Sequence, residues 1–208
     1  MKKKQLIISV GREFGSGGHE IATMIAEKYN LPIYDHNLLK EMAASRKLGA
    51  DTVQELEAYD EQKKNKLLSR TVRGFSNSPA QNVAYMEFDF LEGKAKSGES
   101  FVVVGRCSET ILKGNKGLIP IFVIGDMDKK VERVMRIYNL SESRAQAFVN
   151  DKDKRRKDYH NSYCKIKWGD SRNYDLTINS SRLGMEESVR IISEYIDARI
   201  RALAEEQK

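Results

Sequence analysis

A glycine-rich loop, FGSGGHE at residues 14–20, follows an apolar run and leads into a segment whose apolar residues recur at helical spacing. Such loops bind phosphate because glycine lets backbone N–H groups turn inward, and the helix N-terminus adds partial positive charge. The loop therefore predicts a nucleotide-binding site, although a tight turn that only lets a strand and a helix pack would use the same glycines. The residues expected to hold the phosphates are Gly15, Ser16, Gly17, Gly18 and His19.

The loop lacks two side chains of the usual phosphate-binding loop, GxxxxGK[ST]. Gly18 stands where the lysine is expected, and His19 or Glu20 stands near the position of the hydroxyl residue that binds Mg²⁺. A phosphate site without this lysine needs cations from other parts of the chain. Arg12 is the nearest in sequence, and we expect it to be catalytic.

Positive charge is concentrated in one segment near the end of the chain. The net charge is +6, and the stretch 150–172 carries eight basic and four acidic residues. Its Arg155 and Arg156 are expected catalytic residues, because an arginine fork can bind two phosphate oxygens while charge develops on a transferring group. A solvated helix face is the alternative for both. A nucleic-acid-binding function is not favoured, because no helix-turn-helix, zinc finger or aromatic RNA-binding motif accompanies the charge.

Apolar runs that alternate with helical segments predict the elements that position these residues. The expected strands are 5–10, 31–35, 101–105, 118–125 and 174–179. Pro120 is expected to exclude the first residues of the fourth run from its strand. The alternation favours an α/β fold with a five-stranded parallel sheet covered on both faces, in which ligands bind beyond the carboxyl ends of the strands.

The region between the second and third strands shows no strand pattern and is expected to be a helical insertion. Its expected helices lie near 37–44, 51–72 and 79–96. Apolar residues in this insertion, such as Leu67 and Leu68, could form a homodimer contact or pack inside one subunit.

Four stretches together resemble the cytidylate kinase-like branch of the nucleoside monophosphate kinases, within the P-loop kinases. They are ISVGREFGSGGHEIA near the start, YDHNLL after the second strand, VVVGRCSETIL after the third, and DKDKRRKDYHNSYCKIKWGDSRNYDLTINSSRLGMEESVRII near the end. The resemblance implies a three-layer α/β/α core with a basic helical lid. It divides the chain into a core nucleotide-binding domain at 1–36, 99–140 and 173–208, an acceptor-binding insertion at 37–98, and a lid at 141–172.

The resemblance also implies substrate-binding roles for two residues that follow strands. Arg106, in VGRC, would belong to the acceptor-phosphate region, and Asp35 would lie at the acceptor, where it could orient a sugar or base or sit near the metal. An ion pair between Arg106 and the insertion, and capping of the 37–44 helix by Asp35, are the alternatives. ATP and Mg²⁺ are the implied cofactors, and Glu13, Glu20 and Asp35 stay open as metal ligands.

The function implied is transfer of the ATP γ-phosphate to a nucleoside monophosphate, most directly CMP or dCMP, or to another small phosphorylated acceptor. The alternative, favoured by the missing lysine, is a catalytically weak or inactive pseudo-kinase that senses a nucleotide. The expected partners are therefore a nucleotide donor and a small phosphorylated acceptor, without nucleic acid or membrane.

The cysteines and the hydropathy pattern indicate a cytoplasmic protein. Cys107 and Cys164 form no CxxC pair and no zinc spacing with the three histidines, so we expect free thiols in a reducing compartment. No apolar run approaches the roughly 18 residues of a membrane span. Trp168 and Tyr163, within the basic segment, could stack on adenine or pack in the core beneath the lid.

Overall fold

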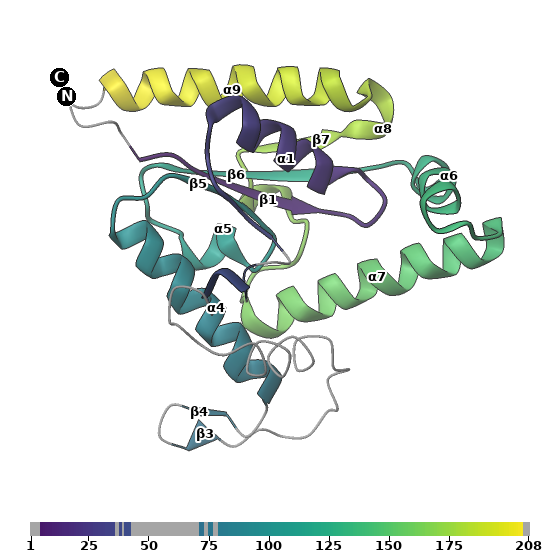
Figure 1. Cartoon of the computed structure of the whole chain (residues 1–208), viewed down its shortest axis with the longest axis horizontal. Helices are drawn as coiled ribbons and strands as arrows, with labels where there is room; N and C mark the ends of the chain where they lie inside the picture. Colours follow the sequence, from purple (N-terminus) through teal and green to yellow (C-terminus); the bar gives the residue numbers. More distant parts are fainter. Residues whose placement is uncertain are drawn as a thin grey trace.

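A computed structural model places a five-stranded parallel sheet at the centre of the protein (Figure 1). The structure describes residues 5–35, 38, 40–42, 71–72, 75–76 and 79–205. The strands of the sheet are β1 (Ile7–Arg12), β2 (Ile33–Tyr34), β5 (Phe101–Val104), β6 (Leu118–Ile124) and β7 (Leu176–Asn179). They lie in the order β2-β5-β1-β6-β7, and every adjacent pair is parallel, which confirms the predicted fold class.

Helices cover both faces of this sheet. The helices are α1 (Gly18–Tyr29), α4 (Pro79–Lys96), α5 (Ser108–Ile111), α6 (Met127–Tyr138), α7 (Glu142–Tyr163), α8 (Ser180–Leu183) and α9 (Met185–Glu205), with a 3-10 turn η1 (Ser171–Asn173). Figure 1 shows α1 and α9 on one face and α4, α5 and α7 on the other. Within the described residues, no helix is both long and apolar enough to cross a membrane.

The two faces of β1 are buried by different helices because successive side chains of a strand point in opposite directions. Ile8 packs in a cluster with Ile25 of α1 and Ile192 of α9. Ile7 packs in a second cluster with Leu91 of α4. All five side chains are fully buried, and each such burial contributes about 1.5–3 kcal/mol. These two clusters hold the carboxyl end of β1, and the loop after it, in a fixed place.

The expectation that Pro120 would keep the start of its run out of the strand is wrong. β6 begins at Leu118, and Pro120 lies in register with Ser9 of β1. The carbonyl oxygen of Pro120 accepts a hydrogen bond from Asp175 N at 2.7 Å, so the nitrogen of Pro120 also faces the β7 side. Because β7 begins only at Leu176, opposite Ile121, the missing N–H has no strand partner there to lose.

The helical insertion agrees with the sequence in part. The expected helix at 79–96 is confirmed as α4. The expected helix at 51–72 is wrong at its end, where β3 (Thr71–Val72) pairs antiparallel with β4 (Phe75–Ser76). Thr71 and Val72 are β-branched and favour a strand. The rest of that helix, most of the helix near 37–44, and Leu67 and Leu68 lie outside the described residues.

Candidate active site

The glycine loop joins β1 to α1 and is held by its own hydrogen bonds. Gly15 and Gly17 have φ values of 80° and 76°, which favour glycine. The buried Ser16 hydroxyl donates to Glu13 O at 2.9 Å and accepts from Gly18 N at 3.3 Å. The serine side chain therefore fixes the loop from inside.

Neighbouring helices leave no room for side chains in this loop. A Cβ on Gly15 would lie 3.0 Å from Lys130 O, and a Cβ on Gly17 would lie 2.2 Å from Met185 Cε. Both glycines are thus favoured by their positive φ, and Gly15 also by the close approach of the α6 backbone at Lys130. This geometry fits the alternative of a tight turn that lets the strand and the helices pack. The same backbone geometry is also compatible with phosphate binding.

The space expected for the missing lysine is filled by Arg12. A Cβ on Gly18 would lie 2.5 Å from Arg12 Cβ and 3.1 Å from Arg12 Cγ. The stem of Arg12 therefore runs where a side chain at position 18 would begin. A side chain at position 18 and the stem of Arg12 would therefore compete for one volume.

The guanidinium of Arg12 extends to the end of β5. Its Nη1 atom lies 2.2 Å from the position that a Cβ on Gly105 would take. The Nε atom is buried and has no hydrogen-bond partner among the described residues. Burial lowers the pKa of Arg12 well below its usual value, the charges of Arg156 and Arg106 lower it further, and Asp35 opposes them. A cation held under these conditions gains strongly from an added anion.

The two arginines of the basic segment lie on different sides of α7. Arg156 Nη1 donates to Arg12 O at 3.2 Å, and its guanidinium lies 5.2 Å from the centre of the Phe14 ring. Burial lowers the pKa of Arg156. Arg155 is exposed and forms an ion pair with Asp151 at 2.8 Å, one turn earlier on the same helix. The structure thus brings Arg156, but not Arg155, next to the loop.

Arg106 follows β5 and connects this edge of the sheet to the insertion. Its Nη1 forms an ion pair with the fully buried Glu87 of α4 at 3.0 Å. Arg106 has a φ of 57°, a conformation uncommon for a residue with a Cβ. The ion pair to the insertion, the alternative given for this residue, is present, and the charge of Arg106 still reaches Arg12.

Asp35 and His19 meet at the carboxyl end of β2. The buried Asp35 carboxylate lies 2.6 Å from His19 Nε2, and His19 is in the first turn of α1. Asp35 O also accepts from Leu38 N at 3.1 Å, so its backbone supports the turn that follows. His19 stands where a phosphate-binding loop has its Ser or Thr. From there it contacts Asp35, the carboxylate that is expected to bind the phosphate-accepting substrate.

A buried lysine that the sequence analysis missed fixes the loop to α6 and α7. Lys130 Nζ pairs with Glu13 Oε2 at 3.1 Å and with Asp153 Oδ2 at 2.7 Å. Asp153 also accepts from Phe14 N at 2.5 Å. Because two carboxylates balance Lys130, this lysine is a structural ion-pair partner and not the unbalanced cation of the site. No local pattern marks it, since its partners lie 117 and 23 residues away.

A cavity of about 480 Å³ borders the glycine loop. Its walls include Gly15 and Ser16 of the loop, Arg133 of α6, Ser181 of α8 and Met185 of α9. The cavity is next to the backbone that would hold phosphates, and it is large enough for part of a small ligand.

The carboxylates left open as Mg²⁺ ligands differ in their surroundings. Glu13 pairs with Lys130, and Glu20 pairs with Arg133. Asp35 alone of the three contributes to the electrostatics of Arg12. Among these carboxylates, Asp35 is the one whose charge reaches Arg12, and it pairs with His19.

The aromatic residues of the basic segment pack against other rings. Trp168 meets Phe122 edge to face, with ring centroids 5.4 Å apart. Tyr163 packs in the same manner on Phe88, at 5.5 Å. Both rings thus take the core-packing alternative in this conformation.

The two cysteines lie near one another and form no disulfide within the described chain. Burial lowers the pKa of His160, but hydrogen bonds to Cys164 and Glu109 outweigh it and raise the pKa to about 10. A hydrogen bond from Cys107 lowers the pKa of Cys164, with help from His160 and against the effect of burial, to about 5. The expected absence of a disulfide holds, but these thiols belong to a polar cluster.

Comparisons with known proteins agree with this geometry. The sequence profile of the cytidylate kinase-like family matches residues 7–182. The chain belongs to this family. A cytidylate kinase from Methanocaldococcus jannaschii is 27% identical over 195 residues, covering 92% of this chain and 98% of the relative. The family expected from the four sequence stretches is confirmed.

Solved structures confirm the fold of this family member. An uncharacterized protein from Eubacterium ventriosum is 39% identical and superposes with a TM-score of 0.73, covering 93% of this chain and 99% of that chain. A shikimate kinase from Bacteroides thetaiotaomicron superposes with a TM-score of 0.51 at 12% identity, covering 92% and 98% of the two chains. The second likeness is one of fold alone.

Proposed function

We propose that the protein transfers the γ-phosphate of ATP to a small phosphorylated acceptor, most directly CMP or dCMP. The observation that carries the proposal is the convergence of Arg12, Arg106 and Arg156 beside a glycine loop. The charges of Arg106 and Arg156 lower the pKa of the buried Arg12, so holding this cation is costly in the empty protein, and a polyanion would reduce that cost. The choice of CMP rests on the relative that is named a cytidylate kinase.

The loop and the arginines would share the work of phosphoryl transfer. The backbone N–H groups of Gly15 to Gly18 would bind donor phosphates, with the nucleoside in the cavity beside Arg133 and Met185. The guanidinium of Arg12 would replace the loop lysine, and Arg156 would neutralise charge that develops on the transferring group. Arg155, exposed on the same helix, would add longer-range positive charge.

The acceptor would bind between the ends of β2 and β5. Arg106 would contact its phosphate, and Asp35, supported by His19, would orient the acceptor. Mg²⁺ would supply positive charge that offsets the charge of the donor phosphates. Asp35, which pairs with His19 and whose charge reaches Arg12, is the residue proposed to hold it.

A coupled assay with ATP and Mg²⁺ over CMP, dCMP, UMP and AMP tests this function. We expect turnover with CMP or dCMP that falls by about 100-fold or more in Arg12→Met, because loss of one donor to a developing anion costs about 3 kcal/mol. Arg144→Met, an exposed arginine on α7, is the matched control and should keep full activity. Activity that survives in Arg12→Met would contradict the assignment of the cation.

A nucleotide sensor without catalysis is the second candidate. The observation that favours it is Gly18, which supplies no lysine. In that case ATP would bind tightly, binding would fall in Arg12→Met, and no acceptor would be phosphorylated. Calorimetric titration of ATP alongside the coupled assay separates the two functions.

A further inference from the structure

Two helix ends meet on the α7 side of the sheet and bring four metal-ligating side chains together. The first turn of α5 and its N-cap supply Glu109 and Cys107, and the end of α7 supplies His160 and Cys164. All four are buried, with exposed fractions between 3% and 8%. The ligand atoms of Glu109, His160 and Cys164 lie within 4.8 Å of one another, and the Cys107 thiol hydrogen-bonds to the Cys164 sulfur.

We propose that Cys107, Glu109, His160 and Cys164 form a tetrahedral structural Zn²⁺ site. Two sulfurs, an imidazole nitrogen and a carboxylate oxygen are a donor set that suits zinc and disfavours Mg²⁺ or Ca²⁺. Ligand atoms of a tetrahedral zinc lie about 3.3–3.8 Å apart, from bond lengths of about 2.0–2.3 Å. Metal binding therefore requires the longer separations among Glu109, His160 and Cys164 to shorten by up to about 1.5 Å and the Nε2–Oε1 pair to open from 2.7 Å, while the Cys107 sulfur turns toward the ion.

The orientation of His160 fits a zinc ligand. Asn161 Oδ1 accepts from Trp168 N at 3.0 Å, so the atom of Asn161 that faces His160 Nδ1 at 3.3 Å is an acceptor. His160 Nδ1 must then carry a hydrogen, which leaves Nε2 to face Glu109 Oε1 at 2.7 Å. A metal would take the place of the proton between Nε2 and Oε1, and Asn161 would orient the ring from behind.

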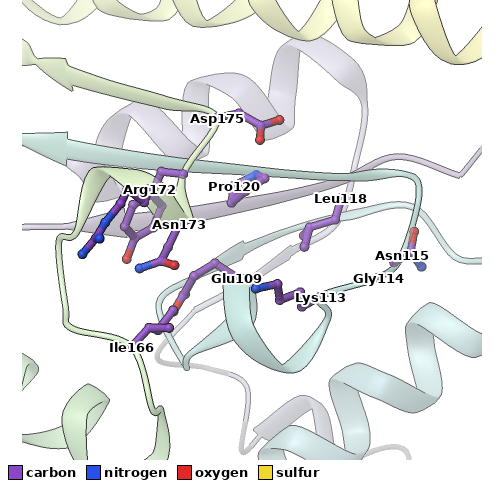
Figure 2. A pocket seen from close by; sticks show the side chains of 11 residues that line it. Glu109, Lys113, Gly114, Asn115, Leu118, Pro120, Ile166, Arg172, Asn173 and Asp175 are labelled. Carbon is purple, nitrogen blue, oxygen red and sulfur yellow. The ribbon is translucent and has the colours of Figure 1, made fainter.

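A route to the cluster exists through Glu109. This residue lines a cavity of about 270 Å³ that also borders Ile166 and Asn173. Figure 2 shows the Glu109 side chain on the wall of this cavity. An ion can therefore reach the carboxylate first, and the Cys107 thiol and His160 Nε2 would then lose their protons to solvent as it binds, while Cys164 would bind as the thiolate.

The metal would join two parts of the candidate active site without entering it. Cys107 directly follows Arg106, and His160 lies four residues after Arg156 on α7. A zinc that holds Cys107 to His160 would fix the distance between these two arginines. The proposal does not depend on phosphoryl transfer, because it concerns the packing of α5 against α7.

Titration of the reduced full-length protein with metal alone tests the site. We expect one Zn²⁺ per chain in competition with a chromophoric chelator, and a rise in the unfolding midpoint on binding. Co²⁺ in place of Zn²⁺ should give intense visible bands of tetrahedral cobalt and a thiolate-to-cobalt charge-transfer band. This cobalt spectrum needs no variant, so it decides the matter even where a substitution harms folding. Absence of stoichiometric binding, or a weak octahedral spectrum without thiolate charge transfer, would overturn the proposal.

Substitutions identify the ligands. Cys107→Ser, Cys164→Ser and His160→Gln should each weaken Zn²⁺ binding at least 100-fold, and Glu109→Gln at least 10-fold. Asp158→Asn, an exposed acid on α7, is the control and should bind as the parent does. Circular dichroism without metal checks that each variant is folded. Unchanged Zn²⁺ affinity in folded Cys164→Ser and His160→Gln would place any bound ion elsewhere and refute the site.

Discussion

Adding a single methyl group at Gly18 should destabilise this protein, although alanine is the better helix former. Gly18 begins α1 and does not have a positive φ, so alanine would meet no backbone strain there. Its Cβ, however, would lie 2.5 Å from Arg12 Cβ and 3.2 Å from Val123 Cβ. Carbon atoms pack best about 3.5–4.0 Å apart, so strand and helix must separate. Overpacking of this kind costs about 1–3 kcal/mol.

The measurement is the free energy of unfolding from urea denaturation of Gly18→Ala. The matched control is Gly93→Ala on α4, where a Cβ would meet nothing within 4 Å. The control should gain up to about 1 kcal/mol from helix propensity, while Gly18→Ala should lose about 1–2 kcal/mol. The two substitutions add the same methyl group, so a change in the free energy of unfolding that differs in sign identifies the contacts of position 18 with Arg12 and Val123 as the cause.

A double-mutant cycle attributes the loss to Arg12. In the Arg12→Gly background, Gly18→Ala should be neutral or stabilising, which gives a coupling of about 2 kcal/mol. In the same background, Gly18→Lys should regain part of the ATP affinity lost in Arg12→Gly, because the lysine then has the volume and the role of the arginine. Equal stability of Gly18→Ala and the parent protein, or strictly additive effects in the cycle, would refute the reasoning.

Four substitutions test the charges around the loop. Arg12→Met should leave the free energy of unfolding within about 1 kcal/mol of the parent, because it relieves repulsion, while ATP affinity measured by calorimetry falls at least 10-fold. In the coupled assay, Arg156→Met should lower kcat about 100-fold and Arg155→Met less than about 5-fold. A larger loss in Arg155→Met than in Arg156→Met would show that α7 turns the Arg155 side toward the substrates during catalysis. Lys130→Met should cost about 3 kcal/mol in urea denaturation, since it leaves Glu13 and Asp153 without their cation; a cost below about 1 kcal/mol would contradict a buried ion-pair network.

The sheet and the loop were predictable because their signals are local. Apolar runs such as that of β1 and the helical spacing of α1 depend only on near neighbours in the chain. The parallel pairing of the strands followed from their alternation with helices, but their order in the sheet did not. The missing lysine directed attention to Arg12, and this residue, close to the loop in sequence, also lies against it in space.

The rest of the site depended on partners that the sequence does not bring together. The burial of Lys130 follows from Glu13 and Asp153, one from the loop and one from α7. Helical periodicity could not say that Arg156 lies inside and Arg155 outside, because adjacent residues on a basic, weakly amphipathic helix give no apolar stripe. The sequence analysis predicted no metal site at the cysteines. The two halves of their cluster, one with Cys107 and Glu109 and the other with His160 and Cys164, are separated by more than fifty residues of the chain.

The parallel sheet also determines when binding competence arises during folding. β1 pairs with β5 and β6, joining Ile7 to Phe101 and to Leu118, so its contacts span about half the chain. Such non-local pairings form slowly because the entropy of closing a long loop is lost before any contact between the strands stabilises the chain. Arg12, Arg106 and Arg156 belong to segments brought together only by those pairings. The proposed nucleotide binding would therefore report completed folding in this chain, and a refolding experiment should recover it after helical circular dichroism, never before.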